Sequence, residues 1–282
     1  MNTKHLPPTA SLVLCLTISL APANLFAQGT LTPPGAPAPT MRTLTQIEPR
    51  TPVAGGMTGN GLLLTGPGSY YLTGNVTLTN DNSSAIYLYG NNISLDLNGF
   101  SVINGRTNTS NTTGISAHWS GGQTNVSVRN GWVVGFDAGV VLSATQSLIE
   151  DLTITDSHMR GINVLGNNGS NFVTIIRRNV ILNTDLNRSG FPNNPATAIL
   201  TQDASGIIEA NTISGLIGLS GNSNLNGRGI VIQGGKHMLL LNNRISVADV
   251  GIQMNSVSRY RDNVTAAVTT AYTGGTNLGN NQ

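Results

Sequence analysis

A short pattern that returns at irregular intervals constrains the fold of this chain more than any other feature. Each copy holds a small residue, an apolar residue, any residue and a second apolar residue, and neighbouring copies start 22 to 37 residues apart. Repeats with such a period are typical of solenoids, in which each repeat forms one coil that stacks on the next. The seven copies begin at Ala85, Gly114, Gly139, Gly161, Ala198, Gly229 and Gly251.

A second marker closes another strand in each repeat. An apolar run ends at or just before an Asn in six repeats, and Asp151 takes that place in the third. Asn adopts left-handed backbone more readily than most residues, so it suits a corner between strands. Amides stacked one per coil can also hydrogen-bond to each other along the axis as a ladder. The six asparagines are Asn98, Asn130, Asn179, Asn211, Asn243 and Asn263.

These two markers predict an all-β chain, a single-stranded right-handed parallel β-helix of about seven coils over residues 69–265. Residues 1–27 are expected to form a signal peptide, because Lys4 precedes a mostly apolar stretch and Ala27 suits cleavage. That stretch is too short to span a bilayer. Residues 28–68 are rich in proline and are expected to form an extended tether or strap. Residues 266–282 are expected to be a polar tail that covers or leaves the last coil.

Composition limits where such a chain works and what it binds. Only 9% of the residues are charged and the formal net charge is +2, which argues against a nucleic-acid or anionic-membrane surface. The single cysteine, Cys15, lies inside the expected signal peptide, so no disulfide framework is expected. We therefore predict a protein that is secreted or held at the cell surface, in the extracellular or periplasmic space, without a membrane span.

Strand geometry assigns faces to the first strand of each repeat. With the apolar positions inward, the positions between them point outward, because side chains alternate along a strand. Two outward rows result. The first row is Tyr87, Ser116, Val141, Asn163, Leu200, Val231 and Gln253, and the second is Tyr89, His118, Ser143, Leu165, Gln202, Gln233 and Asn255.

Neither outward row contains a carboxylate, a lysine or an arginine, whereas glycoside hydrolysis needs a pair of carboxyl groups beside the bond. Tyrosine rings can stack on sugars and amides can hydrogen-bond to them. The alternative interpretation is a plain solvated sheet with two exposed tyrosines. The candidate contacts for an extracellular polysaccharide are Tyr87, Tyr89, His118, Asn163, Gln202 and Gln233.

A charged group is expected beside that sheet, at the turn that leads into its strands. Asp137 lies one repeat before His158 and Arg160, and stacked coils are about 4.8 Å apart. An Asp, a His and an Arg together could abstract a proton and hold a carboxylate, so these three are the candidate catalytic residues. The alternative is a set of surface ion pairs along a turn.

The repeats resemble those of the right-handed parallel β-helix proteins, the architecture of pectate lyases and polygalacturonases. Four further segments are similar to a family of exported bacterial β-helix proteins without an established activity. This resemblance implies the fold and leaves the function open. The four segments are residues 34–41, 47–52, 68–72 and 95–100.

Three hypotheses about function follow. The first is a secreted β-helix protein that binds or scaffolds extracellular polysaccharide without cleaving it. The second is a polysaccharide lyase or glycoside hydrolase that uses the Asp137, His158 and Arg160 corner, and the third is a structural surface or adhesion protein. The twelve acidic residues are dispersed, so neither a calcium site nor another metal or cofactor is expected.

Overall fold

The computed structural model describes residues 49–80, 83–106, 111–117, 123–166, 172–184, 195–216, 218, 226–234, 237–254 and 258–282. The chain divides into two compact units, Met1–Ile47 and Glu48–Gln282, and all described residues belong to the second. The expected signal peptide and most of the expected proline-rich segment therefore lie outside the described residues. Leucine, isoleucine and valine alternate with polar residues along the second unit, which is the pattern of half-buried strands.

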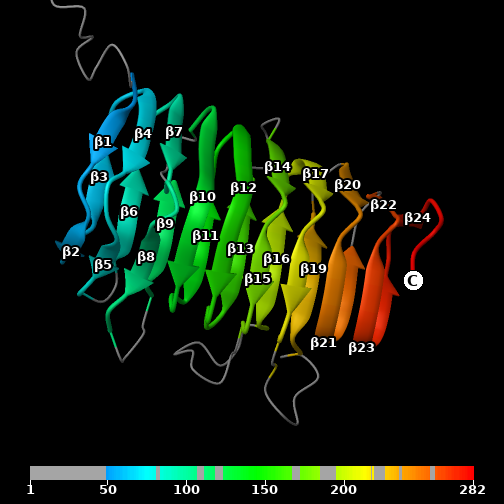
Figure 1. Ribbon diagram of the computed structural model, residues 1–282. Helices are drawn as coiled ribbons and strands as arrows, with labels where there is room; N and C mark the ends of the chain where they lie inside the picture. Colours follow the sequence, from blue (N-terminus) through cyan, green and yellow to red (C-terminus); the bar gives the residue numbers. More distant parts are fainter. Residues whose placement is uncertain are drawn as a thin grey trace, which may run out of the picture. The chain divides into compact units, whose positions relative to one another are not determined.

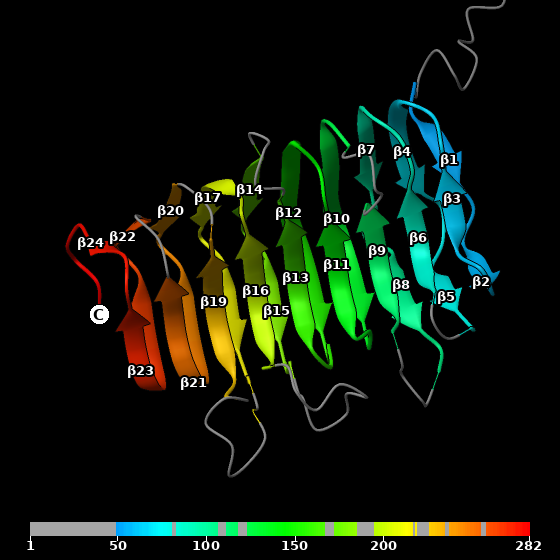
Figure 2. The same ribbon diagram turned by 180° about the vertical axis from the view of Figure 1, so that it is seen from behind.

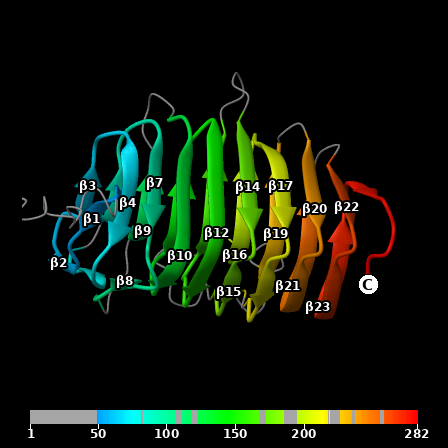
Figure 3. The same ribbon diagram turned by 45° about the horizontal axis from the view of Figure 1, so that its top comes forward.

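The second unit is a right-handed parallel β-helix, as the repeats predict. Its strands follow one another along a single axis from β1 to β24 (Figure 1). Every strand pairing in the described part of the chain is parallel and joins one coil to the next. Each coil contributes up to three strands, so three parallel sheets surround the core (Figures 2 and 3).

Sheet I holds the strands that end at the asparagine marker. Its members are β1 (Thr51–Val53), β4 (Gly68–Leu72), β7 (Ile93–Asp96), the first parts of β10 (Val126–Val134) and β12 (Gln146–Thr155), β14 (Val173–Arg177), β17 (Ser205–Glu209), β20 (Met238–Leu241), β22 (Arg259–Arg261) and β24 (Thr276–Asn277).

Sheet II follows the corner after sheet I. Its members are β2 (Gly56–Thr58), β5 (Val76–Leu78), β8 (Ser101–Asn104), the second parts of β10 and β12, β15 (Val180–Leu182), β18 (Thr212–Ser214), and the first parts of β21 (Arg244–Met254) and β23 (Val264–Thr273). The two sequence markers do not identify this sheet, since most of its strands are only three residues long.

Sheet III is formed by the seven repeat copies and two additional strands. Its members are β3 (Leu62–Leu64), β6 (Ser84–Leu88), β9 (Thr113–Ala117), β11 (Ala138–Leu142), β13 (Arg160–Leu165), β16 (Thr197–Gln202), β19 (Arg228–Gln233), and the second parts of β21 and β23. The first apolar residues of all seven copies pair in one register, from Ile86 to Ile252.

The coils extend beyond the expected bounds of 69–265. Strands β1 to β3 form a coil before Ser69, and β23 and β24 continue the sheets after Thr265. Sheet III therefore has nine strands in the described part of the chain rather than about seven. The early coil escapes a repeat search because its strands Thr51–Val53 and Gly56–Thr58 consist largely of small and polar residues.

The core consists of the inward side chains of the three sheets. The predicted inward positions of sheet III are buried, among them Ile115, Ile162 and Ile230 at 0% exposure. Complete burial of such a side chain contributes roughly 1.5 to 3 kcal/mol to folding. Stacked isoleucines in successive coils therefore stabilise the fold without a disulfide.

The asparagine marker covers two structurally different positions. Asn98 and Asn130 have positive φ and lie exposed at the left-handed corner, as does Asp151 in the third repeat. In the later repeats the corner residue precedes the Asn, for example Arg178 and Ala210. The prediction of left-handed backbone is therefore correct for the first three repeats and wrong for Asn179, Asn211, Asn243 and Asn263.

These four later asparagines form the amide ladder that the sequence allowed. Each is 0% exposed, and each Nδ2 donates to the Oδ1 of the next asparagine at 2.9 to 3.1 Å. The backbone N–H of each donates to the same Oδ1. The last acceptor is Asn281, so the C-terminal segment closes the ladder.

Charged residues form a second column at the end of sheet I. Asp96, Arg129, Glu150, Arg177 and Glu209 occupy equivalent positions in successive coils, with alternating sign. Arg129 lies 3.2 Å from Asp96, and Arg177 lies 2.8 Å from Glu150. Both carboxylates are buried and paired, which satisfies their charge.

Candidate functional site

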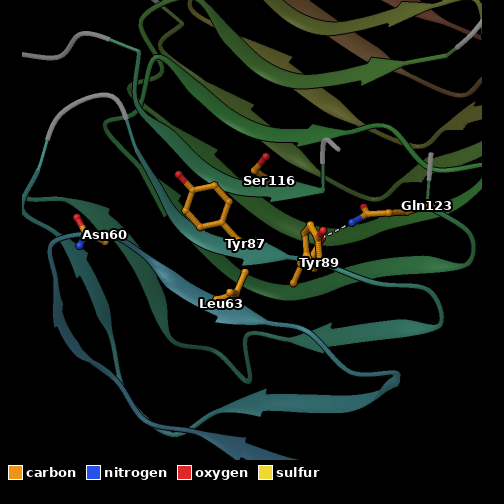
Figure 4. Close-up of a pocket in the computed structure, with 7 residues that line it drawn as sticks. Asn60, Leu63, Tyr87, Tyr89, Ser116 and Gln123 are labelled. Carbon is orange, nitrogen blue, oxygen red and sulfur yellow. Dashed lines mark hydrogen bonds between the residues drawn. The ribbon is translucent and has the colours of Figure 1, made fainter. Parts of the chain in front are cut away.

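A pocket lies on the outer face of sheet III at its first three strands, β3, β6 and β9. It has a volume of about 340 Å³, which falls within the range of small-molecule sites. Figure 4 shows its side chains, with the rings of Tyr87 and Tyr89 above β6 and Leu63 on the neighbouring strand. The lining residues are Asn60, Leu63, Tyr87, Leu88, Tyr89, Ser116 and Gln123.

Tyr87 is held in place by the coil before it. Gly61 has a φ of 81°, and a Cβ atom there would lie 2.7 Å from the Tyr87 ring. The absence of a side chain therefore lets the ring lie against the first coil. The Tyr87 hydroxyl accepts a hydrogen bond from the Ser84 backbone N–H at 2.9 Å. This bond and the contact with Gly61 fix the orientation of one pocket wall.

Tyr89 and Leu63 supply the accessible apolar surface of the pocket. Tyr89 is 41% exposed and Leu63 is 60% exposed. The Gln123 Nε2 donates to the Leu88 carbonyl at 2.6 Å. The Gln123 Oε1 is buried and has no hydrogen-bond partner among the described residues. A buried acceptor without a donor is costly, and this one has almost no surface open to the pocket.

The first predicted outward row is exposed over only part of its length. Asn163 and Leu200 are each 4% exposed and Val231 is 1% exposed, so the middle of the first row is covered. Strand periodicity identifies the face of a side chain but cannot show what lies over that face. Asn163, predicted as a sugar contact, is therefore placed on the predicted face but is buried.

The remaining predicted contacts lie in different environments. Gln202 and Gln233 are half-buried neighbours, and Gln202 Nε2 donates to Gln233 Oε1 at 3.0 Å. Their amides thus already bind each other. His118 lies outside the described residues. Of the six predicted contacts, the structure brings Tyr87 and Tyr89 together in one pocket.

The predicted catalytic corner contains a real contact, but a buried one. His158 Nδ1 lies 3.3 Å from Asp137 Oδ1, and Asp137 Oδ2 accepts from the Thr112 N–H at 3.0 Å. Asp137 is 2% exposed and His158 is 5% exposed. The Asp137 side chain thus joins two neighbouring coils, and neither group offers much surface to a polymer.

Arg160 lies beside this pair at the start of β13. Its backbone N–H donates to the Asp137 carbonyl at 2.9 Å, and partial burial lowers the pKa of its guanidinium. Among the described residues, no carboxylate forms an ion pair with Arg160. The structure therefore places the three predicted residues side by side, with the Asp and the His in side-chain contact.

Several pocket residues were not predicted from the sequence. Leu63 and Asn60 lie in the segment expected to be a strap, and Gln123 lies between repeats. Because the three consecutive leucines at 62–64 fit a buried strand, they are the one signal that could have extended the coils backward.

The described residues form neither a candidate metal site nor a membrane-spanning helix. No three His, Cys, Asp or Glu side chains there come together as a possible metal site. No helix in the same residues is long and apolar enough to cross a membrane.

Comparison with known proteins gives little further information. No protein-family model and no curated protein matches the sequence. Among solved structures, the catalytic domain of a GH87 α-1,3-glucanase, determined as the D1069A variant with tetrasaccharides, is similar at 14% identity with a TM-score of 0.37. The similarity covers 82% of this chain and 64% of that domain, and it is too weak to support an inference.

Proposed function

We propose that this protein is an exported β-helix protein that binds extracellular polysaccharide without cleaving it. The observation that carries the proposal is the pocket on sheet III, where two tyrosines and an exposed leucine meet neutral hydrogen-bonding groups. Aromatic side chains offer large apolar area with a polar tip, which suits the alternating faces of a sugar ring. Amide and hydroxyl groups can then fix the orientation of the ring.

The chemistry of the lining favours binding over bond cleavage. None of the seven lining residues is an Asp, Glu, His, Lys or Arg. Hydrolysis requires a general acid and a second carboxylate, and elimination requires a base. The same composition favours a neutral saccharide, because none of the described lining residues is a cation that could pair with a uronate or sulfate group.

Binding to an array of neutral and acidic glycans, followed by titration calorimetry, tests the proposal. We expect a neutral oligosaccharide to bind, and Tyr89→Ala to weaken binding at least tenfold because a stacking surface is lost. Trp132→Ala is the matched control, since Trp132 is 49% exposed on β10 and is not a pocket residue. Binding that is unchanged by Tyr87→Ala and Tyr89→Ala together would refute this pocket as the site. Absence of any glycan ligand would favour a structural or adhesive role.

The Asp137 and His158 contact favours a second candidate function, a polysaccharide lyase or hydrolase. Its test is incubation with pectin, alginate and neutral polymers, followed by ultraviolet absorbance and reducing-end assays. Product formation by the unaltered protein that His158→Gln abolishes would support this enzyme. No product from any polymer would leave the contact as a link between coils.

Export is part of the proposal and has its own test. Antibody detection in cell fractions should find the protein outside the cytoplasm, with a mature N-terminus close to Gln28. A cytoplasmic protein that retains residues 1–27 would contradict it.

A further inference from the structure

The outer face of sheet I carries an aliphatic row that the proposed function does not use. Leu148, Ile175, Ile207 and Leu239 occupy one register position on β12, β14, β17 and β20. All four are half-buried and lie outside the core. The four strands lie side by side in Figure 3. Since neighbouring strands are about 4.8 Å apart, this aliphatic row is roughly 14 Å long.

The row has a sharp beginning. The equivalent positions in the two preceding coils are Ser127 and Ser94, whose hydroxyls are 2.8 Å apart. The outer face of this sheet thus changes from a serine pair to four consecutive aliphatic side chains. A row of this kind exposes apolar surface in a line, and lines or patches of exposed apolar surface commonly mark binding sites.

At the other end the row opens into a second pocket, with a volume of about 480 Å³. Leu239 belongs to both, and Leu278, 48% exposed, extends the apolar lining. The remaining lining residues are His237, Met238 and Arg259. Its size falls within the range of ligand sites, and its walls are mostly aliphatic rather than aromatic.

Arg259 gives this end a positive charge. It pairs with Leu239 in the strand register, so it occupies the next position of the same row. Its side chain is exposed, and within the described part of the chain it takes part in no ion pair. None of the described residues that line the pocket is acidic. An arginine at the end of an apolar row favours a ligand with a carboxylate at one end, because guanidinium binds carboxylate in a two-pronged geometry.

We propose that this surface binds a single-chain amphiphilic anion of the fatty-acid type. Its hydrocarbon chain lies along Leu148, Ile175, Ile207 and Leu239, and its carboxylate binds Arg259. This site lies on sheet I, whereas the proposed polysaccharide site is the pocket on sheet III, so neither site depends on the other.

The charged column argues against the surface of a bilayer as the ligand. Glu150, Arg177 and Glu209 lie two residues further along the same strands as the aliphatic row. A flat membrane that covered the row would also cover the half-buried Arg177 and Glu209 and remove the water that remains on them, which is costly. A single chain can occupy the row alone.

Titration calorimetry with dodecanoate below its micellar concentration tests the proposal, with 1-dodecanol as the uncharged analogue. We expect dodecanoate to bind the full chain and Arg259→Gln to weaken it about tenfold, with little effect on dodecanol. Ile207→Thr, which keeps a β-branched residue in the strand, should weaken both ligands. Arg244→Gln is the matched control, because Arg244 is exposed on β21 and is not in the pocket.

Three results would overturn the proposal. One is no binding of dodecanoate by the unaltered protein. The second is an equal loss of dodecanoate binding in Arg259→Gln and Arg244→Gln, which would indicate a general charge effect. The third is sedimentation with phosphatidylglycerol vesicles without binding of free dodecanoate, which would identify a membrane as the ligand.

Discussion

The early and late coils of this β-helix turn the same corner in different ways. In the early coils the position after the left-handed residue is Gly131 and then Leu152, whereas in the later coils it is Asn179, Asn211, Asn243 and Asn263. The early corner combines close packing at Gly131 and Leu152 with hydrogen bonds from Asn98 and Asn130 to the Asp96 carboxylate. The late corner is held by a column of buried amides. The comparison shows that one backbone path can be stabilised by two different sets of interactions.

The largest expected effect comes from interrupting the late corner. Asn211→Ala removes the acceptor of two Asn179 donors and the donor to the Ile176 carbonyl, all inside a fully buried column. Because unsatisfied buried donors cost about 1 to 3 kcal/mol each, we expect a loss of about 3 to 5 kcal/mol. Urea unfolding followed by circular dichroism measures it. A loss below 1 kcal/mol would show that the ladder is dispensable.

The early corner should be sensitive to the size of the side chain at position 131. A Cβ atom on Gly131 would overlap the Leu97 side chain and lie 2.6 Å from the Phe100 carbonyl oxygen. We therefore expect Gly131→Ala to destabilise the protein by roughly 1 to 3 kcal/mol, the usual cost of overpacking. The urea midpoint measures the change. Equal stability of Gly131→Ala and the unaltered protein would mean that this corner is loosely packed.

The left-handed position itself should respond to the type of residue that occupies it. Ala210 occupies it with a φ of 54° and is exposed, although a side chain makes this conformation unfavourable. Replacement by glycine should therefore stabilise the protein by about 0.5 to 1 kcal/mol. A thermal melt gives the direction of the change. Asn242→Ala, the reverse kind of change one coil later, should destabilise by a similar amount, and an opposite sign in either variant would contradict this interpretation.

The smallest expected effect is electrostatic. It concerns Asp151, the left-handed residue of the coil just before the first ladder asparagine. The hydrogen bond from Arg178 lowers the pKa of the Asp151 carboxyl below its ordinary value of 3.8. The stabilisation is therefore present above that ordinary value and disappears as the pH falls through the lowered one. Asp151→Asn, which suits left-handed backbone, should cost about 0.5 kcal/mol or less at pH 7.

Urea midpoints at neutral and acid pH check this expectation. The difference between Asp151→Asn and the unaltered protein should disappear at a pH well below 3.8. A difference that persists in acid would mean that Asp151 acts through something other than its charge.

The sequence predicts the backbone path of this protein better than its surface. The register of Ile86 with Ile115 and the later isoleucines follows from spacing alone, because a solenoid coil must bury one face. The amide ladder also follows, although only Asn179 and the later asparagines form it. Asn98 and Asn130 have the left-handed backbone themselves, whereas the ladder asparagines directly follow the left-handed residue. A pattern that allows the Asn to shift by one residue cannot distinguish these two positions.

The sequence predicts only part of the candidate site, because a pocket depends on segments that lie far apart in the chain. Tyr87 and Tyr89 were identified because alternation fixes their face. Leu63 and Gln123 were missed because the pocket depends on an additional early coil and on a loop between repeats. Asn163 was assigned to an open surface and is buried, since exposure depends on what other segments cover.

The amide ladder also bears on how this chain can change over evolutionary time. Its successive asparagines are 32, 32, 20 and 18 residues apart along the chain, yet their amide contacts stay between 2.9 and 3.1 Å. The length of the intervening segment therefore has no influence on the pitch of the coil at this corner. Insertions and deletions can therefore accumulate in the segments between ladder asparagines while the coils keep the same stacking. The surface loops can diversify without a change in the core of the β-helix.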